Sequence, residues 1–239
     1  FIYDTIKIFI LLGVLIFLTV FYLMITEKVP NAWATMLGGL VMALLGIINE
    51  ENALEAVYER LEIIFLLVGM MMIVEIMSDT GVFQWVAIKI AQVAKGDPTK
   101  ILIFISVVTA LFSAMLDNVT TILLVVPVTI FLAKRLEVDP EPFVLLQIFM
   151  SNIGGTATMI GDPPNLIIAS LGNIGFNDFI INLAPLILIN TVVLLGSASL
   201  YFKKKLTVSR ELKMSIMELD LGRTIKDKKL LVQSLALFS

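Results

Sequence analysis

Two short groups of polar residues interrupt apolar stretches of this 239-residue sequence, and both carry oxygen atoms suited to binding a cation. The first, Asp-Asn-Val-Thr-Thr at 117–121, lies in the middle of the apolar stretch 101–136. An aspartate at the depth of a bilayer costs about 2.5–3.5 kcal/mol, so a functional reason for it is expected. We predict that Asp117, Asn118 and Thr120 bind an ion and that Thr121 lines its pathway. The alternative is that Asp117 or Asn118 only caps the next helix, and both roles can coexist.

The second polar group covers residues 151–165 and ends in Gly-Asp-Pro-Pro-Asn. Three glycines and two prolines cannot sustain a regular helix, and Gly154-Gly155 lets a backbone approach an ion closely. Asp162 suits three roles, namely cation binding, proton transfer, or capping a helix that begins at Pro163. The predicted ion ligands here are Ser151, Asn152, Gly154 and Gly155, and the predicted pathway residues are Thr156, Thr158, Asp162 and Asn165.

Helix breaks make these groups suitable for ions. Carbonyl oxygens at the end of one half-helix face a cation, and N–H groups at the start of the next face an anion. Irregular backbone at membrane depth survives only when it lines a cavity or is buried in protein. Two such breaks in adjacent apolar stretches are therefore stronger evidence than either alone.

The elements that carry these groups are predicted to form an all-α membrane protein. Hydrophobic residues make up 59% of the chain and charged residues 15%, against about 25% charged in soluble domains. A span needs about 20 apolar residues, and four segments fit that role: 6–25, 32–48, 62–77 and 182–202. The stretch 101–136 would be about 54 Å long as one helix, so we expect it to fold at 117–121.

We interpret 101–136 as a re-entrant hairpin that enters from the cytoplasm, with two short crossings as the alternative. Residues 142–171 are interpreted as a broken helix. Residues 82–95 are amphipathic and are predicted to be an interfacial helix. Residues 1–202 would then form one membrane unit, and 203–239 a cytoplasmic linker.

Successive loops are alternately poor and rich in lysine and arginine. Because the rich loops are expected in the cytoplasm, the N-terminus is predicted to be outside and the basic tail cytoplasmic. The chain begins without methionine and ends in an apolar segment, 230–238, so we expect a missing second half. Cysteine and histidine are absent, which excludes disulfides and leaves carboxylates as the proton carriers. No basic run suggests a nucleic-acid partner. We expect no cofactor other than sodium or protons as the coupling ion.

The two polar groups also resemble a known superfamily. Leu-Asp-Asn-Val-Thr-Thr at 116–121, followed by Pro127, and the 151–165 segment are similar to motifs of the ion transporter superfamily. That superfamily includes arsenite permeases, NhaD-type sodium/proton antiporters, P-protein-like permeases and sodium/dicarboxylate symporters. The resemblance is greatest to the P-protein-like and citrate-transporter-like branch and covers nearly the whole chain as an N-terminal repeat.

The resemblance implies an elevator-type carrier, usually a homodimer, built from two inverted repeats in a lipid membrane. Asn118 and the hairpin tip would form half of a sodium site with Gly154-Gly155, and the missing repeat would supply the other half. Dicarboxylate symporters carry Ser-Asn-Thr at this tip, whereas this chain has Asp117-Asn118-Val119. An acidic tip suits a cation or proton better than a carboxylate substrate.

The leading functional hypothesis is a secondary active transporter, antiporter or symporter, for a small ion or anion. A channel-like anion pathway is the nearest alternative, and a non-transporting scaffold half is another. An enzyme of a different class, an intramembrane aspartyl protease, would use Asp117 and Asp162. Such enzymes need two acids that share a proton across facing helices, and here both lie in polar breaks.

Overall fold

The computed structural model describes residues 2–48, 58, 61–203, 206–225, 227 and 229–233. All regular elements in these residues are helices, and several are long and apolar enough to cross a membrane, so the predicted all-α membrane fold is confirmed. The candidate spans are Lys7–Ile25, Asn118–Arg135 and Phe176–Phe202. The acidic residues Glu50, Glu51, Glu55 and Glu59, the basic residues Lys204 and Lys205, and most of the predicted apolar end lie outside the described residues.

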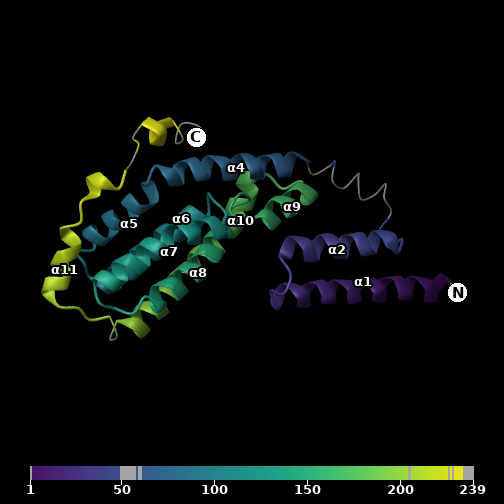
Figure 1. Cartoon of the computed structure of the whole chain (residues 1–239), viewed down its shortest axis with the longest axis horizontal. Coiled ribbons are helices and arrows are strands. Elements are labelled where there is room, and N and C mark those ends of the chain that lie inside the picture. Colours follow the sequence, from purple (N-terminus) through teal and green to yellow (C-terminus); the bar gives the residue numbers. More distant parts are fainter. Residues whose placement is uncertain are drawn as a thin grey trace. The chain divides into compact units, whose positions relative to one another are not determined.

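The first of two compact units comprises residues 1–64 and contains the helices α1 (Ile2–Ile25) and α2 (Asn31–Leu44), which pack as a pair (Figure 1). A Cβ placed on Gly38 would lie 2.4 Å from Val20 Cγ2, so only glycine permits this approach of the two helices. α2 has 14 residues, about 21 Å, and falls short of the predicted span 32–48. Gly46, at φ +67°, ends the helix early in a left-handed turn.

The second unit, residues 65–239, contains most of α4 (Leu61–Asp79) and all later elements. α4 continues into α5 (Val82–Val93) through a bend of 59° at Gly81. The buried residues of α5 are Phe83, Ala87, Ile88 and Ala91, which pack in the core, and its predicted interfacial location stays a prediction. The small alanines let α5 lie against the hairpin.

The predicted hairpin forms from α6 (Pro98–Ser113) and α7 (Asn118–Arg135), with the break at residues 114–117. The predicted broken helix forms α8 (Glu141–Gly155) and α9 (Pro163–Gly172). α10 (Phe176–Phe202) follows as a single helix. The second break lies within the predicted group 151–165, whereas the first comes slightly earlier than the predicted 117–121 and shares only Asp117 with it, because Asn118 already begins α7. α7 is long and apolar enough to cross a membrane, and whether the hairpin dips or crosses stays a prediction.

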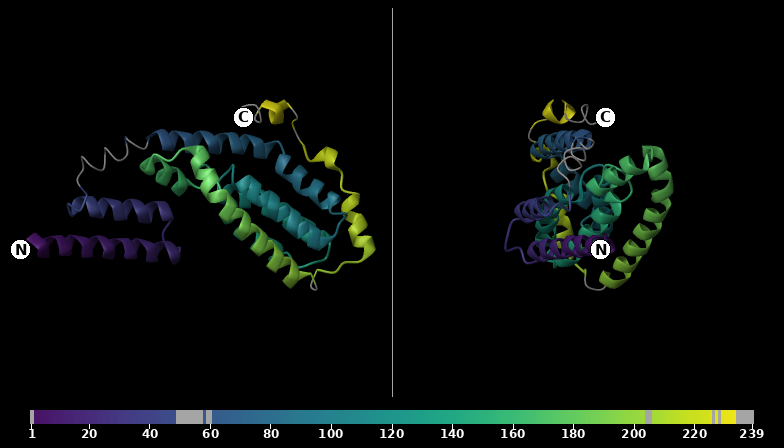
Figure 2. Two further views of the ribbon diagram at one scale, coloured as in Figure 1. Left: turned by 180° about the vertical axis from the view of Figure 1, so that it is seen from behind. Right: turned by 90° about the vertical axis from the view of Figure 1, so that its right-hand side faces the viewer.

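The core of the second unit lies among α5, α6, α7 and α8, which run side by side in Figures 1 and 2. α6 and α8 lie in close contact at Gly154, where a Cβ would lie 2.1 Å from the Ala110 carbonyl oxygen. A fully buried amide crosses the three helices, because Gln147 Nε2 donates to Thr129 Oγ1 at 2.9 Å and to Thr109 Oγ1 at 3.4 Å. These contacts fix α8 against both arms of the hairpin.

The predicted linker is not a free segment where the structure describes it. α11 (Arg210–Met217) and a 3₁₀ turn (Leu221–Arg223) pack on α5 and α7. Leu206 and Ile216 are buried in the same core, and Gln92 Nε2 donates to the Leu219 carbonyl at 2.9 Å. The strong amphipathic pattern of α11 explains this docking, since its apolar side needs a covering partner. The cytoplasmic location of the tail stays a prediction.

Candidate functional site

The start of α7 is held by Asp117. Its backbone is extended and its Oδ1 accepts a hydrogen bond of 2.8 Å from the Thr120 N–H. This satisfies one of the N–H groups that a helix start leaves free. The capping role predicted for Asp117 is confirmed. Thr120 takes part in the cap through its backbone N–H and not through its hydroxyl. An ion-binding role for both residues stays a prediction.

The hairpin tip meets α8 through one hydroxyl group. Ser113 Oγ, at the end of α6, lies 2.6 Å from both Asn118 Oδ1 and the Ser151 carbonyl oxygen. A serine has one proton to donate, so only one of these two acceptors receives it at a time. The other acceptor oxygen then faces Ser113 Oγ without receiving a hydrogen bond from it. The tip is therefore rich in acceptors.

The other end of the Asn118 amide faces the broken helix. Its Nδ2 lies 3.3 Å from Asp162 Oδ2 and 3.4 Å from Asn152 Oδ1. Asp162 occupies the N-cap position of α9, yet its side chain makes no capping hydrogen bond. The predicted capping role of Asp162 is therefore wrong, because its carboxylate turns toward Asn118 instead. Both distances are long for hydrogen bonds donated by an amide, so the Asn118 amide is held loosely on this side.

Two glycines let the broken helix come this close. A Cβ on Gly155 would lie 2.0 Å from Asn118 Oδ1 and 2.9 Å from the Gly161 carbonyl oxygen. A Cβ on Gly161 would lie 2.6 Å from the carbonyl oxygens of both Gly155 and Ser113. Backbone and side-chain oxygens thus converge where only hydrogen atoms fit. Such crowding of oxygens favours a positively charged neighbour.

The loop between α8 and α9 is held by its own side chains. Asn165 Nδ2 donates to the carbonyl oxygens of Gly155 (3.0 Å) and Thr158 (2.9 Å). Thr158 Oγ1 donates to the Ala114 carbonyl of the hairpin and accepts from the Gly161 N–H at 3.0 Å. The side chains of Thr158 and Asn165 therefore stabilise the conformation of the loop. Their predicted place in a transport pathway stays a prediction.

Not all predicted residues join this cluster. Thr156 Oγ1 donates back to the Asn152 carbonyl at 2.8 Å, within its own helix turn. Ser151 contributes through its carbonyl, since its hydroxyl lies 3.3 Å from the Ile148 carbonyl. Thr121 is fully buried, and among the described residues its hydroxyl has no hydrogen-bond partner.

Sequence reasoning missed Ser113, Gly161 and the buried Gln147. Gln147 was open to discovery, because a side-chain amide inside an apolar stretch is costly and points to a role. Ser113 carries no such signal, because serine is small and common near helix ends. Its role follows only from the folding of the hairpin against α8.

Apolar helices around two polar breaks that meet define a membrane transporter of the broken-helix kind. Residues 21–239 match the citrate transporter family, and the chain belongs to that family. This confirms the resemblance to the citrate-transporter-like branch. The family is one of transporters, so the protease alternative is set aside. The two carboxylates also have different partners, the Thr120 N–H for Asp117 and the Asn118 amide for Asp162.

Curated relatives agree with this assignment. A "46 kDa membrane protein" of Mycobacterium leprae is 40% identical over 224 residues, 93% of this chain and 52% of the relative. An "uncharacterized transporter" of Mycobacterium tuberculosis is 39% identical over 223 residues, 92% of this chain and 52% of the relative. The P protein of Homo sapiens is 43% identical over 154 residues, 63% of this chain and 18% of that protein. The chain spans about half the length of the mycobacterial relatives.

Proposed function

We propose that this chain is half of a secondary active transporter that moves a small ion or anion, coupled to sodium or protons. The observation that carries the proposal is the meeting of the two breaks at Asn118. Its amide lies between the Ser113 hydroxyl on one side and the Asp162 carboxylate on the other. One side-chain amide thus joins the hairpin to the broken helix at an oxygen-rich point.

A cation is the occupant that this chemistry favours. Hard cations such as sodium are held by carbonyl, hydroxyl, amide and carboxylate oxygens. Ser113 Oγ supplies one neutral oxygen, and Asn118 Oδ1 and the Ser151 carbonyl oxygen, each 2.6 Å from it, supply two more. Asp162 supplies the negative charge. Ser113 Oγ can donate to only one of its two neighbouring oxygens, so it and the other oxygen repel each other. A bound cation would relieve that repulsion.

The experiment is transport by the full-length protein reconstituted in proteoliposomes. Sodium entry and internal pH would be followed by dyes while the sodium and pH gradients are imposed separately, with and without citrate. We expect substrate or ion movement against one gradient at the expense of the other. Movement that only follows each ion's own electrochemical gradient would support the channel-like anion pathway instead.

Asn118→Ala is the variant that tests the site within the same assay. We expect it to weaken the dependence on the coupling cation, because the amide that joins the two breaks is lost. Asn182→Ala is the matched control, since its side chain donates within its own helix, to the Asp178 carbonyl. An unchanged response of Asn118→Ala to sodium and to pH would leave Asn118 with a structural role only.

A further inference from the structure

A basic cavity lies at the other end of α6 from the hairpin tip. Its volume is about 380 Å³, and its polar lining comes from α6, α11 and the connections beside them. The polar lining residues are Asp97, Thr99, Lys100, Lys203, Thr207 and Lys213. No function discussed above uses this cavity.

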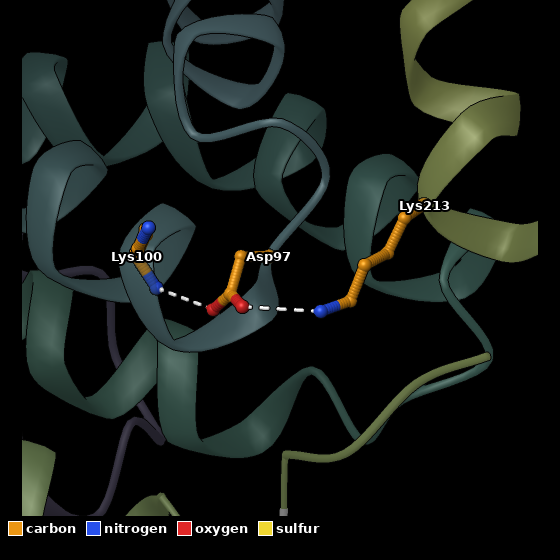
Figure 3. A network of polar contacts seen from close by, with 3 residues as sticks. All are labelled: Asp97, Lys100 and Lys213. Atoms are coloured by element: carbon orange, nitrogen blue, oxygen red, sulfur yellow. Dashed lines mark hydrogen bonds and ion pairs between the residues drawn. The ribbon is translucent and has the colours of Figure 1, made fainter. Parts of the chain in front are cut away.

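The lysines of the cavity come from three different elements. Lys100 lies in the first turn of α6, Lys203 follows α10, and Lys213 is carried by the docked α11. Lys213 Nζ lies 3.1 Å from Asp97 Oδ2, and Figure 3 shows this pair beside Lys100. Among the described residues, Lys100 and Lys203 have no acidic partner within ion-pair distance. Three positive charges thus face one negative charge, which Lys213 already neutralises.

An apolar groove lies near this cavity, with a smaller cavity between them. α10, a candidate span, ends at Phe202, immediately before Lys203. A groove of about 380 Å³ between α8 and α10 is lined almost entirely by apolar side chains, and it ends at Tyr201 and Phe202. Lysines at the end of a span lie at the level of lipid headgroups. A smaller cavity that includes Asp139 and Glu141 joins the two, because it shares Tyr201 and Phe202 with the groove and Leu206 with the basic cavity.

We propose that the basic cavity binds a phosphate-bearing anion, the headgroup of an anionic phospholipid, whose acyl chain lies in the groove between α8 and α10. The Lys100 and Lys203 ammonium groups would contact the phosphate, and Thr99 and Thr207 would offer hydroxyl donors. Because Lys213 reaches the cavity only when α11 is docked, lipid binding would also favour the docked tail. The proposal does not depend on the substrate or the coupling ion.

The test uses the full-length protein in detergent, with thermal unfolding as the readout. Mixed micelles would contain phosphatidylcholine alone or phosphatidylcholine with phosphatidylglycerol. A separate arm would add inorganic phosphate to phosphatidylcholine micelles. The test variant is Lys100→Gln with Lys203→Gln, which keeps both the Asp97–Lys213 pair and the backbone hydrogen bond from Lys100 to Asp97. Lys89→Gln is the matched control, because Lys89 is exposed on α5 and lies outside the cavity.

We expect phosphatidylglycerol to raise the unfolding temperature of the unmodified protein and of Lys89→Gln. Each cavity lysine removed should weaken the lipid affinity about fivefold, and the double variant about thirtyfold. Equal protection by inorganic phosphate with the same loss in the double variant would assign the cavity to a free anion. If phosphatidylglycerol raises the unfolding temperature of the double variant as much as that of the unmodified protein, the proposal is wrong.

Discussion

The two polar breaks begin their second helices with the same residue but use it differently. Asp117 precedes α7 and Asp162 precedes α9, each in an extended conformation. Asp117 accepts from the Thr120 N–H and caps its helix, whereas Asp162 makes no cap and faces the Asn118 amide. Local sequence offers both residues the same role. The contacts between the hairpin and the broken helix decide which one keeps it.

The difference has a physical cause in the residues that follow. A cap accepts from the N–H of the second or third residue of a helix. The second residue of α9 is Pro164, which has no N–H, and the third, Asn165, donates its N–H to the Asp162 carbonyl at 2.9 Å. α9 therefore gains less from a cap than α7, which begins with Asn118. The carboxylate of Asp162 is left available for a tertiary partner. Of the two, Asp162 is thus the stronger candidate for a direct role in ion binding.

The largest effect is expected from Gly155→Ala, which would separate the two breaks. Its Cβ would lie 2.0 Å from Asn118 Oδ1, so the hairpin tip or the broken helix must move. We expect transport to be lost and the free energy of unfolding to fall by about 1–3 kcal/mol. Gly196→Ala is the control, because a Cβ there meets nothing within 4 Å. Normal transport by Gly155→Ala would show that close contact of the breaks is not required.

Asp162→Asn is expected to have the next largest effect. It removes the negative charge but keeps the size of the side chain, and charged hydrogen bonds contribute about 1.5–3 kcal/mol. We expect the apparent affinity for the coupling ion to fall about tenfold or more, with little loss of folded protein. Ion dependence of flux in proteoliposomes is the measurement. If Asp162→Asn transports normally while Asp117→Asn does not, the ranking of the two aspartates is reversed.

Much of the fold follows from the sequence because apolar length and helix-breaking residues act locally. Residues 151–165 contained the second break, residues 117–121 lay at the end of the first, and apolar length marked α1, α4 and α10. The site followed only in part. Asn118 and Gly155 were identified, but Ser113 becomes important only when the hairpin packs against α8. The docking of α11 was missed because a short charged helix looks like a linker until its partner is known.

Asp117 offers a finer test, because asparagine caps a helix about as well as aspartate. Asp117→Asn should therefore leave the unfolding free energy nearly unchanged, and Asp117→Ala should lower it by about 1 kcal/mol. Any change in sodium or pH dependence of Asp117→Asn then reports on the charge alone. Thermal unfolding and flux would be measured on the same preparations. If Asp117→Asn leaves flux unchanged, Asp117 has only the capping role.

The smallest effect is expected at a third aspartate of this kind, Asp97, which caps α6 outside the breaks. Burial raises the pKa of Asp97. The opposing effects are larger together: hydrogen bonds from the Lys213 side chain and the Lys100 N–H, and the charges of both lysines, bring the pKa below its ordinary value. A lowered pKa in the folded state means that the contact stabilises docking above the ordinary aspartate pKa and is lost as the pH falls through the lowered value. The pair is about one-third exposed, so the gain is about 0–1 kcal/mol. We expect hydrogen exchange in α11 to increase only on acidification below about pH 4. The same increase in Asp97→Asn, which keeps the cap without the charge, would show that other groups control the docking of α11.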